Sequence, residues 1–144
     1  MESKTKETAE KRVKEGWIRT AMMIEVLAVS ENASKSALEK HIEKLENEEG
    51  VIVYKKNFHP VEKVEKPLPN VETGFSCVAE IEIVAKNFDK LVYIVMNYAP
   101  SSIEVLEPEK IVLDEGEAQG ILNSIADVLH RFAAAGLGGV LIQT

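Results

Sequence analysis

Apolar residues occur along the chain in two kinds of pattern, and the first kind predicts β-strands. The stretch 75–85 alternates throughout, with Cys77 on one face and Glu80 on the other. The stretch 20–30 is apolar on both alternation faces, which predicts a central strand covered on both sides. Four strands are expected in all, over residues 20–30, 51–56, 75–85 and 102–108.

The second pattern is helical spacing, which appears between the first two strands. Leu38, Ile42 and Leu45 fall on one helical face, and Gly50 follows as a C-terminal stop. Short polar residues that accept hydrogen bonds from free amides are the usual caps at a helix start. The candidate caps here are Asn32, Ser34 and Ser36.

Two further helices are expected later in the chain. One begins after Asn87 and ends before Pro100, because the residue preceding a proline avoids helical geometry. The other opens at Asp114 and Glu117, which have capping-box spacing, and stays amphipathic as far as Phe132.

The remaining segments differ in composition. Residues 2–15 alternate acidic and basic side chains and predict a solvated helix or a loose arm. We therefore expect a charged N-terminal segment, 1–16, followed by a single α+β domain, 17–144. Residues 57–74 contain prolines and predict a long loop, and the apolar tail after residue 135 could add a small edge strand.

The order of these elements predicts a fold. A β-α-β-β-α-β sequence with right-handed crossovers closes as a ferredoxin-like plait. Its strands are then ordered fourth, first, third, second. The complete prediction is an α+β plait with a charged N-terminal helix or arm and an extra C-terminal amphipathic helix.

Composition narrows the classes of partner. The net charge is −7, which disfavours binding to nucleic acid or to an anionic membrane. No stretch has the ~20 apolar residues of a membrane span, and the N-terminal segment lacks the apolar core of a secretory signal. With a single cysteine, Cys77, the simplest expectation is a reduced, cytoplasmic protein. The abundance of Glu and Lys is typical of heat-adapted proteins.

Catalytic and cofactor motifs are not visible in the chain. His41, His59 and His130 are scattered and belong to no zinc-binding pattern. There is no phosphate-binding glycine motif, and Cys77 falls on the inward alternation face, where a thiol is inert. We therefore expect no cofactor and name no catalytic residue, which leaves open whether the protein is an enzyme.

A ligand site is expected where three loops of the plait share one end of the sheet. These are the loop before the first helix, the loop 57–74 and the segment "YAPSS" at 98–102. The N-terminal amides of the first helix point to the same end and favour an anion. The same residues could instead serve only as caps and turns. The candidate ligand-binding residues are Asn32, Ser34, Lys35, His59, Tyr98, Ser101 and Ser102.

Acidic residues form a second candidate group. Four carboxylates are expected to share one face of the sheet: Glu25, Glu80, Glu82 and Glu104. Hard cations such as Mg²⁺ or Ca²⁺ favour such oxygen ligands. The alternative, which we favour, is a solvated sheet face that holds no metal.

Two stretches resemble known families. "EVLAVSENASKSALEKHIEKLENEEGVIVYKK" resembles the opening βαβ unit of ACT and RAM-type regulatory domains, and Asn32 matches the polar residue at the head of their first helix. That resemblance implies a plait that binds amino acids or other small effectors and forms dimers. "SSIEVLEPEKI" is similar to the closing strand of some WYL regulatory domains.

The sequence therefore supports three functional hypotheses. The first is a cytoplasmic regulatory or ligand-sensing module that self-associates, as a dimer or a larger homo-oligomer, and binds a small anionic effector. The second is an interaction scaffold that uses the Pro-rich loop and the acidic face to grip a basic partner. The third is a small metal-dependent enzyme built on the acidic face.

Overall fold

The computed structural model describes residues 2–136 and confirms an α+β fold. Its elements follow one another in the order α1 (Glu2–Lys14), β1 (Ile18–Ala28), α2 (Glu31–Glu46), β2 (Val51–Phe58), β3 (Glu62–Leu68), β4 (Val71–Ala85), α3 (Phe88–Tyr98), β5 (Ser102–Glu107) and α4 (Glu115–Ala134). None of the helices within this range is long and apolar enough to span a bilayer.

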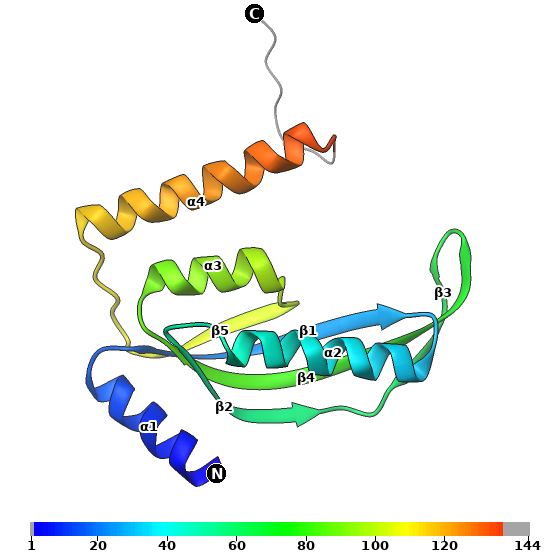
Figure 1. Cartoon of the computed structure of the whole chain (residues 1–144), viewed down its shortest axis with the longest axis horizontal. Coiled ribbons are helices and arrows are strands. Elements are labelled where there is room, and N and C mark those ends of the chain that lie inside the picture. The colour runs from blue at the N-terminus through cyan, green and yellow to red at the C-terminus, as the bar shows by residue number, and fades with distance from the viewer. Residues whose placement is uncertain (1, 137–144) are drawn as a thin grey trace, which may run out of the picture.

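The sheet has the strand order of a ferredoxin-like plait. Its order is β2-β4-β1-β5, which matches the predicted fourth, first, third, second, and β3 adds to β4 outside this path. All the pairings are antiparallel, and β1 pairs with β4 without a break from Ile18 opposite Ala85 to Ala28 opposite Phe75. Helices α2 and α3 lie on one side of the sheet, and α1 lies on the other (Figure 1).

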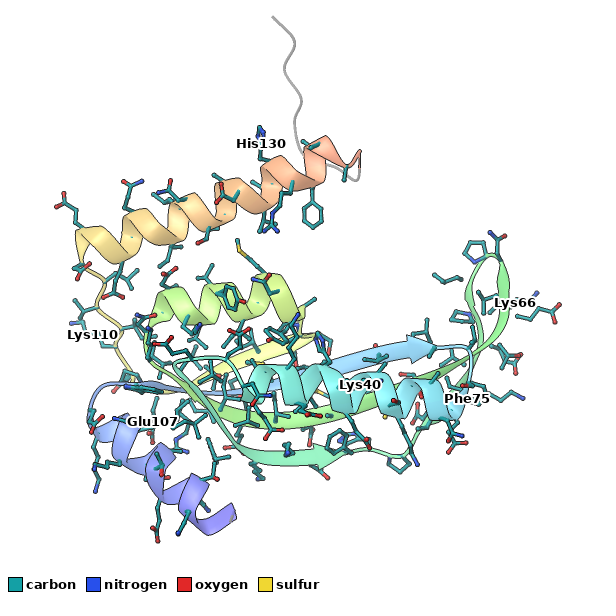
Figure 2. All side chains as sticks on the ribbon, in the orientation of Figure 1. Lys40, Lys66, Phe75, Glu107, Lys110 and His130 are labelled. Atoms are coloured by element: carbon teal, nitrogen blue, oxygen red, sulfur yellow. The ribbon has the colours of Figure 1, made fainter. Side chains whose placement is uncertain are left out.

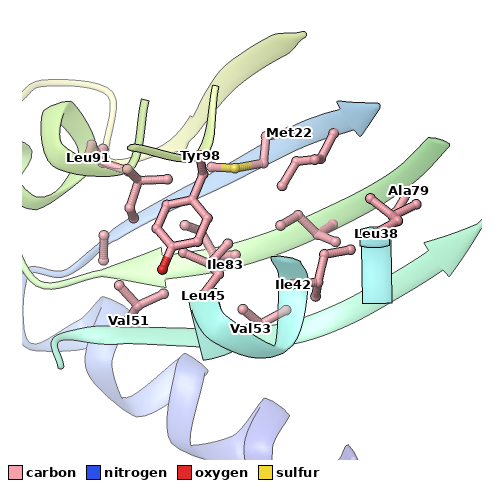
Figure 3. Packing of buried hydrophobic residues seen from close by; sticks show 14 of the residues in the cluster. Met22, Leu38, Ile42, Leu45, Val51, Val53, Ala79, Ile83, Leu91 and Tyr98 are labelled. Atoms are coloured by element: carbon pink, nitrogen blue, oxygen red, sulfur yellow. The ribbon is translucent and has the colours of Figure 1, made fainter. Parts of the chain in front are cut away.

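The core lies between the sheet and α2 with α3. The predicted alternation of the third plait strand is confirmed, since Cys77, Ala79 and Ile81 are buried on the helix side of β4. The predicted stripe on α2 packs onto them, and Figure 3 shows its Leu38 and Ile42 directed at the sheet. Cys77 is a free thiol in this core, as expected, and burial raises its pKa.

The opposite face of the sheet is only partly covered. Helix α1 packs against β2 and β4 at one end of this face, where Ala9 and Val84 are fully buried. The predicted charged helix is therefore part of the fold rather than a loose arm. The expectation that the first strand is covered on both sides is wrong, because its outward residues become half-buried and then exposed toward Ala28.

The prediction of a long loop over residues 57–74 is also wrong. The chain forms β3 there and extends β4 back to Val71, which makes a hairpin that projects beyond the rest of the sheet (Figure 1). Prolines are tolerated because β3 pairs on one edge only. The register shifts between Glu65 and Leu68, where Lys66 has a positive φ of 48° and Pro67 follows.

Helix boundaries agree with the sequence at two of three starts. Asn87 caps α3 and Asp114 caps α4, each accepting a hydrogen bond from the amide three residues on. The cap of α2 is Ser30 rather than Asn32, Ser34 or Ser36, and its hydroxyl accepts from the Ala33 amide. The strand ends two residues earlier than expected, so the helix also begins earlier.

Helix α4 forms a further layer that packs on α3 and not on the sheet (Figure 1). Gly120 faces α3, since a Cβ there would lie in ordinary contact, 3.6 Å from a carboxylate oxygen of Asp89. The expected strand in the tail after residue 135 falls on residues outside the described range.

Glu48 joins the end of α2 to α3. Its Oε1 accepts hydrogen bonds from Tyr98 Oη at 2.9 Å and Tyr93 Oη at 3.1 Å, and its Oε2 lies 3.7 Å from Lys90 Nζ. The bond from Tyr98 is the largest of the effects that lower the pKa of this carboxyl group, and it outweighs the opposing effect of burial.

We expect Glu48→Gln to destabilise the protein by roughly 1 kcal/mol at neutral pH, because a neutral amide is a weaker acceptor than a carboxylate. The folded pKa is lowered, so the contribution is complete above the unfolded value of about 4.3 and is lost as pH falls through the folded pKa. Urea unfolding at neutral and acidic pH measures the difference. Glu49→Gln, at an exposed neighbour, is the control, and an equal loss in both variants at neutral pH would contradict the prediction.

Thr20 provides a second test of the core. It is fully buried between Ile83 and Val105 in the register of β1, and its hydroxyl has no hydrogen-bond partner in the described part of the chain. Thr20→Val keeps the shape and removes the unpaired polar group, so we expect unchanged or higher stability, by up to about 1 kcal/mol. A clear fall in the unfolding midpoint would show that the hydroxyl has a partner in solution.

Candidate functional site

The candidate site is the part of the sheet that no described helix covers, which we call the open sheet face. It lies opposite α2 and α3, beyond the end that α1 occupies. Here the surface is hollowed into a concavity of about 560 Å³. The side chains of the open sheet face that line it are Ala21, Met23, Lys55, Asn57, Glu80, Glu82, Ser102 and Glu104.

Strand register arranges these side chains in two rows across the sheet. The first row, nearer α1, runs from Lys55 through Glu82 and Ala21 to Glu104. The second row runs from Asn57 through Glu80 and Met23 to Ser102. Residues opposite one another on one face lie about 4.5–5.5 Å apart at Cβ, so each row is a continuous strip of surface. The two inner positions of each row are therefore one carboxylate and one apolar side chain, Glu82 beside Ala21 and Glu80 beside Met23.

Arg19 closes the end of the hollow next to α1. Its guanidinium lies 2.7 Å from Glu10 Oε1 on α1 and 3.4 Å from Glu107 Oε2 at the end of β5, and it stacks 5.0 Å from the ring centre of Tyr54. The label in Figure 2 shows Glu107 at the same end of the sheet as α1. Burial opposes the charged form, but hydrogen bonding and charge from Tyr54 and Glu10 leave the Arg19 pKa above its ordinary value.

Tyr54 connects this network to the floor of the hollow. Its hydroxyl donates to Glu82 Oε1 at 2.6 Å, and Lys55 Nζ lies 3.3 Å from Glu82 Oε2. Burial and then the bond to Glu82 raise the pKa of Tyr54 to about 12, against the opposing charge of Arg19. The same hydrogen bond is the main cause of the lowered pKa of Glu82, which therefore stays ionised.

The four carboxylates of the acidic group do share the open sheet face, but they do not converge on one point. Glu25 accepts a hydrogen bond from Ser76, Glu80 lies 3.4 Å from His59 Nε2, and Glu82 is held by Tyr54 and Lys55. Glu104 has no protein partner in the described range. Among the described residues, no group of three His, Cys, Asp or Glu side chains could hold a metal ion.

The predicted ligand residues fall at separate places. Ser102 pairs with Met23, and the Ser101 amide donates to the Met23 carbonyl at 2.8 Å, so this segment lies halfway along β1. Ser30, in contrast, lies two residues beyond Ala28, the last residue of β1. Five residues of strand separate the two levels, or roughly 17 Å. Tyr98 is buried, with its hydroxyl on Glu48, so it faces the core and not a ligand.

The other predicted ligand residues are also dispersed. Ser34 is fully buried and its hydroxyl donates to the Glu31 carbonyl, whereas Asn32 and Lys35 are exposed on the first turns of α2. His59 follows β2 and reaches Glu80 on the open sheet face. Only Ser102 of the predicted set lines the hollow, and His59 lies at its border.

Sequence reasoning missed Arg19, Tyr54, Lys55 and Asn57. The sequence pattern could have placed Arg19 and Tyr54 on this face, because both alternate with the core residues of their strands. Lys55 and Asn57 were not recoverable in this way, since an irregularity between Val53 and Lys55 shifts their parity to the open sheet face.

Comparison with known proteins identifies a family. The family model described as MJ0538 matches residues 19–142, so the chain belongs to the MJ0538 family. No curated protein and no solved structure matches the chain. The matching model is not that of the ACT, RAM or WYL domains, and that resemblance therefore remains one of local pattern.

We expect Glu82→Gln to lower the pKa of Tyr54 from about 12 toward its ordinary value of about 10, because the carboxylate both accepts the phenol hydrogen bond and repels the phenolate. The tyrosinate absorbance of each protein, minus that of the same protein carrying Tyr54→Phe, isolates this titration. Glu80→Gln removes a carboxylate of the same face that does not contact Tyr54, and it should leave the pKa unchanged. Equal shifts in both variants would rule out the direct bond.

Proposed function

We propose that this member of the MJ0538 family is a binding module whose open sheet face takes a basic and partly apolar partner. The observation that carries the proposal is the concavity of about 560 Å³ over two cross-strand rows of carboxylates and apolar side chains. This corresponds to the second of the three hypotheses from the sequence, with the site restricted to the acidic sheet face and without the Pro-rich segment.

Charge favours a cationic partner. Three carboxylates line the hollow, those of Glu80, Glu82 and Glu104, against the single ammonium of Lys55. Glu104 has no cation beside it in the described range, so its charge is available to a ligand. The whole chain carries a net charge of −7, which adds a long-range attraction for cations and raises the association rate.

The floor of the hollow favours a partner with some apolar surface. Ala21 and Met23 lie between the acidic side chains, and Leu27 and Val78 continue the apolar area toward the far end of β1. Leu27 is 44% exposed. Methionine adapts its shape to different partners at low cost. A lysine-rich segment with alternating apolar residues would match both the carboxylates and this floor.

The small anionic effector predicted from the sequence has less support from the geometry. Its residues lie at separate levels of β1, and those nearest the hollow stand beside carboxylates that repel an anion. The regulatory role predicted with that effector remains a hypothesis that binding experiments can address.

The test uses a short peptide in which Lys and Leu alternate, titrated into ¹⁵N-labelled protein and followed by amide chemical shifts. We expect shifts concentrated on β1, β4 and β5 around the hollow. Glu80→Gln combined with Glu104→Gln should weaken binding roughly tenfold, since each exposed charge contact contributes up to about 1 kcal/mol. The affinity should also fall with added salt.

Matched controls distinguish binding at this site from a general attraction of the cationic peptide to a negatively charged protein. Glu39→Gln with Glu43→Gln removes the same charge from exposed positions on α2, on the other side of the sheet, and should leave the affinity within about twofold. The same peptide with acetylated lysines should not bind. Equal weakening by both double variants would contradict the proposal, and so would shifts produced by phosphate or an organic acid in place of the peptide.

A further inference from the structure

Helix α4 carries an apolar stripe that no other part of the chain within residues 2–136 covers. Four large side chains recur at spacings of three, four and three residues, which places them on one side of the helix. Their exposed fractions run from 39% to 63%. They are Leu122, Ile125, Leu129 and Phe132.

The stripe lies beside the contact of α4 with α3 and not within it. Ile121 is buried and Gly120 approaches Asp89, so these positions face α3. At 3.6 residues per turn, the four side chains of the stripe lie between about 20° and 100° around the helix from Ile121, on one flank of that contact. The label in Figure 2 shows His130 on the outer side of α4, pointing away from α3.

Residues of α3 and β5 extend this surface. On α3, Tyr93 reaches Glu48 after α2, so the opposite side of the helix, with Val95, faces away from α2 and toward β5. On β5, Ile103 and Val105 stand on the helix side of the sheet, yet they are 41% and 45% exposed. Helices α3 and α4 run in the same direction (Figure 1). Val95 comes one residue after the buried Ile94, and Leu122 comes one residue after the buried Ile121. Because both helices are right-handed and parallel, the two exposed side chains lie on the same flank.

The area of this flank is near what a stable interface requires. From their exposed fractions, the stripe, Val95, Ile103 and Val105 together leave roughly 600 Å² in contact with water, at the upper end of the ~300–600 Å² of the largest apolar patch on a typical monomer. A standard interface buries about 800 Å² on each partner, with a polar rim around an apolar centre. The flank therefore has the size of an interface centre.

We propose that this flank binds a second copy of the chain and forms a two-fold dimer in which the two α4 helices run antiparallel. A two-fold interface uses the same patch on both subunits, and the patch here contains no charged side chain among its seven residues. The first turn of α4 carries Glu115 and Glu117, and its last turn carries Arg131. Antiparallel pairing brings each acidic end near the basic end of the other helix and opposes the two helix dipoles.

This dimer is independent of the proposed binding function. The flank lies on the helix side of the sheet, and the concavity lies on the open sheet face. Dimer formation therefore leaves the hollow of each subunit accessible. A failure of peptide binding would leave the dimer proposal unaffected, and the reverse also holds.

The test is sedimentation equilibrium of the full chain and of three variants. We expect the wild type to have twice the chain mass of 16.0 kDa. Leu122→Glu and Leu129→Glu place a charge in the stripe and should each raise the dimer dissociation constant at least tenfold. Asn123→Glu adds the same charge to an exposed position of the same helix away from the stripe, and it should remain dimeric.

Circular dichroism and thermal unfolding accompany each variant, because loss of fold would also change the mass. The substituted leucines are 63% and 53% exposed, so both variants should retain the wild-type spectrum. A wild-type chain that is monomeric at the highest concentration it reaches overturns the proposal, since the flank then serves another partner. A dimer that withstands both leucine changes, or dissociates equally with Asn123→Glu, overturns it as well.

Discussion

The structure depends on the pairing of β4, which is hydrogen-bonded along both of its edges. β1 pairs with it on one edge, and β2 and β3 share the other, so among the strands of residues 2–136 only β5 joins the sheet through a different strand. The strict alternation of β4 lets one strand serve two surfaces at once. Ala79 and Ile81 support the helices, while Glu80 and Glu82, between and beside them, form part of the floor of the hollow. A shift of one residue in the register of β4 would move its core side chains to the open sheet face and its carboxylates into the core.

The two faces of the sheet are completed by different physical means. The helix side is closed by apolar packing against α2 and α3, which is fastened at the end of α2 by the tyrosine hydroxyls on Glu48. Within the described part of the chain, the other side is closed only where α1 lies, through Ala9 and the ion pairs of Arg19. Arg19 thus marks the limit between the part of this face that belongs to the fold and the part that is open to a ligand.

The plait was predictable from the sequence, because the alternation of its strands, the apolar spacing of its helices and two of its three helix caps depend on neighbouring residues alone. The sequence did not contain the register of β5 on β1, which decides which loops meet. Since β1 continues five residues beyond the level of Ser102, the segment before that serine lies at the middle of the sheet, far from Ser30. The acidic face was predictable from parity. The position of Lys55 on that face was not, because the irregularity after Val53 is invisible in the residue pattern.

The hairpin of β3 and β4 limits backbone pairing between molecules at one end of the sheet. Its outer edge is interrupted where Lys66 adopts a left-handed conformation and Pro67 lacks an amide hydrogen, and Pro67 also occupies the space beside Gly74, where a Cβ would come within 2.7 Å of its ring. A strand from a neighbouring molecule therefore finds no continuous ladder of donors and acceptors at this end. Pairing of a foreign strand through main-chain hydrogen bonds, which does not depend on its sequence, is therefore blocked at this edge. Contacts there must be made by side chains, which can discriminate among partners.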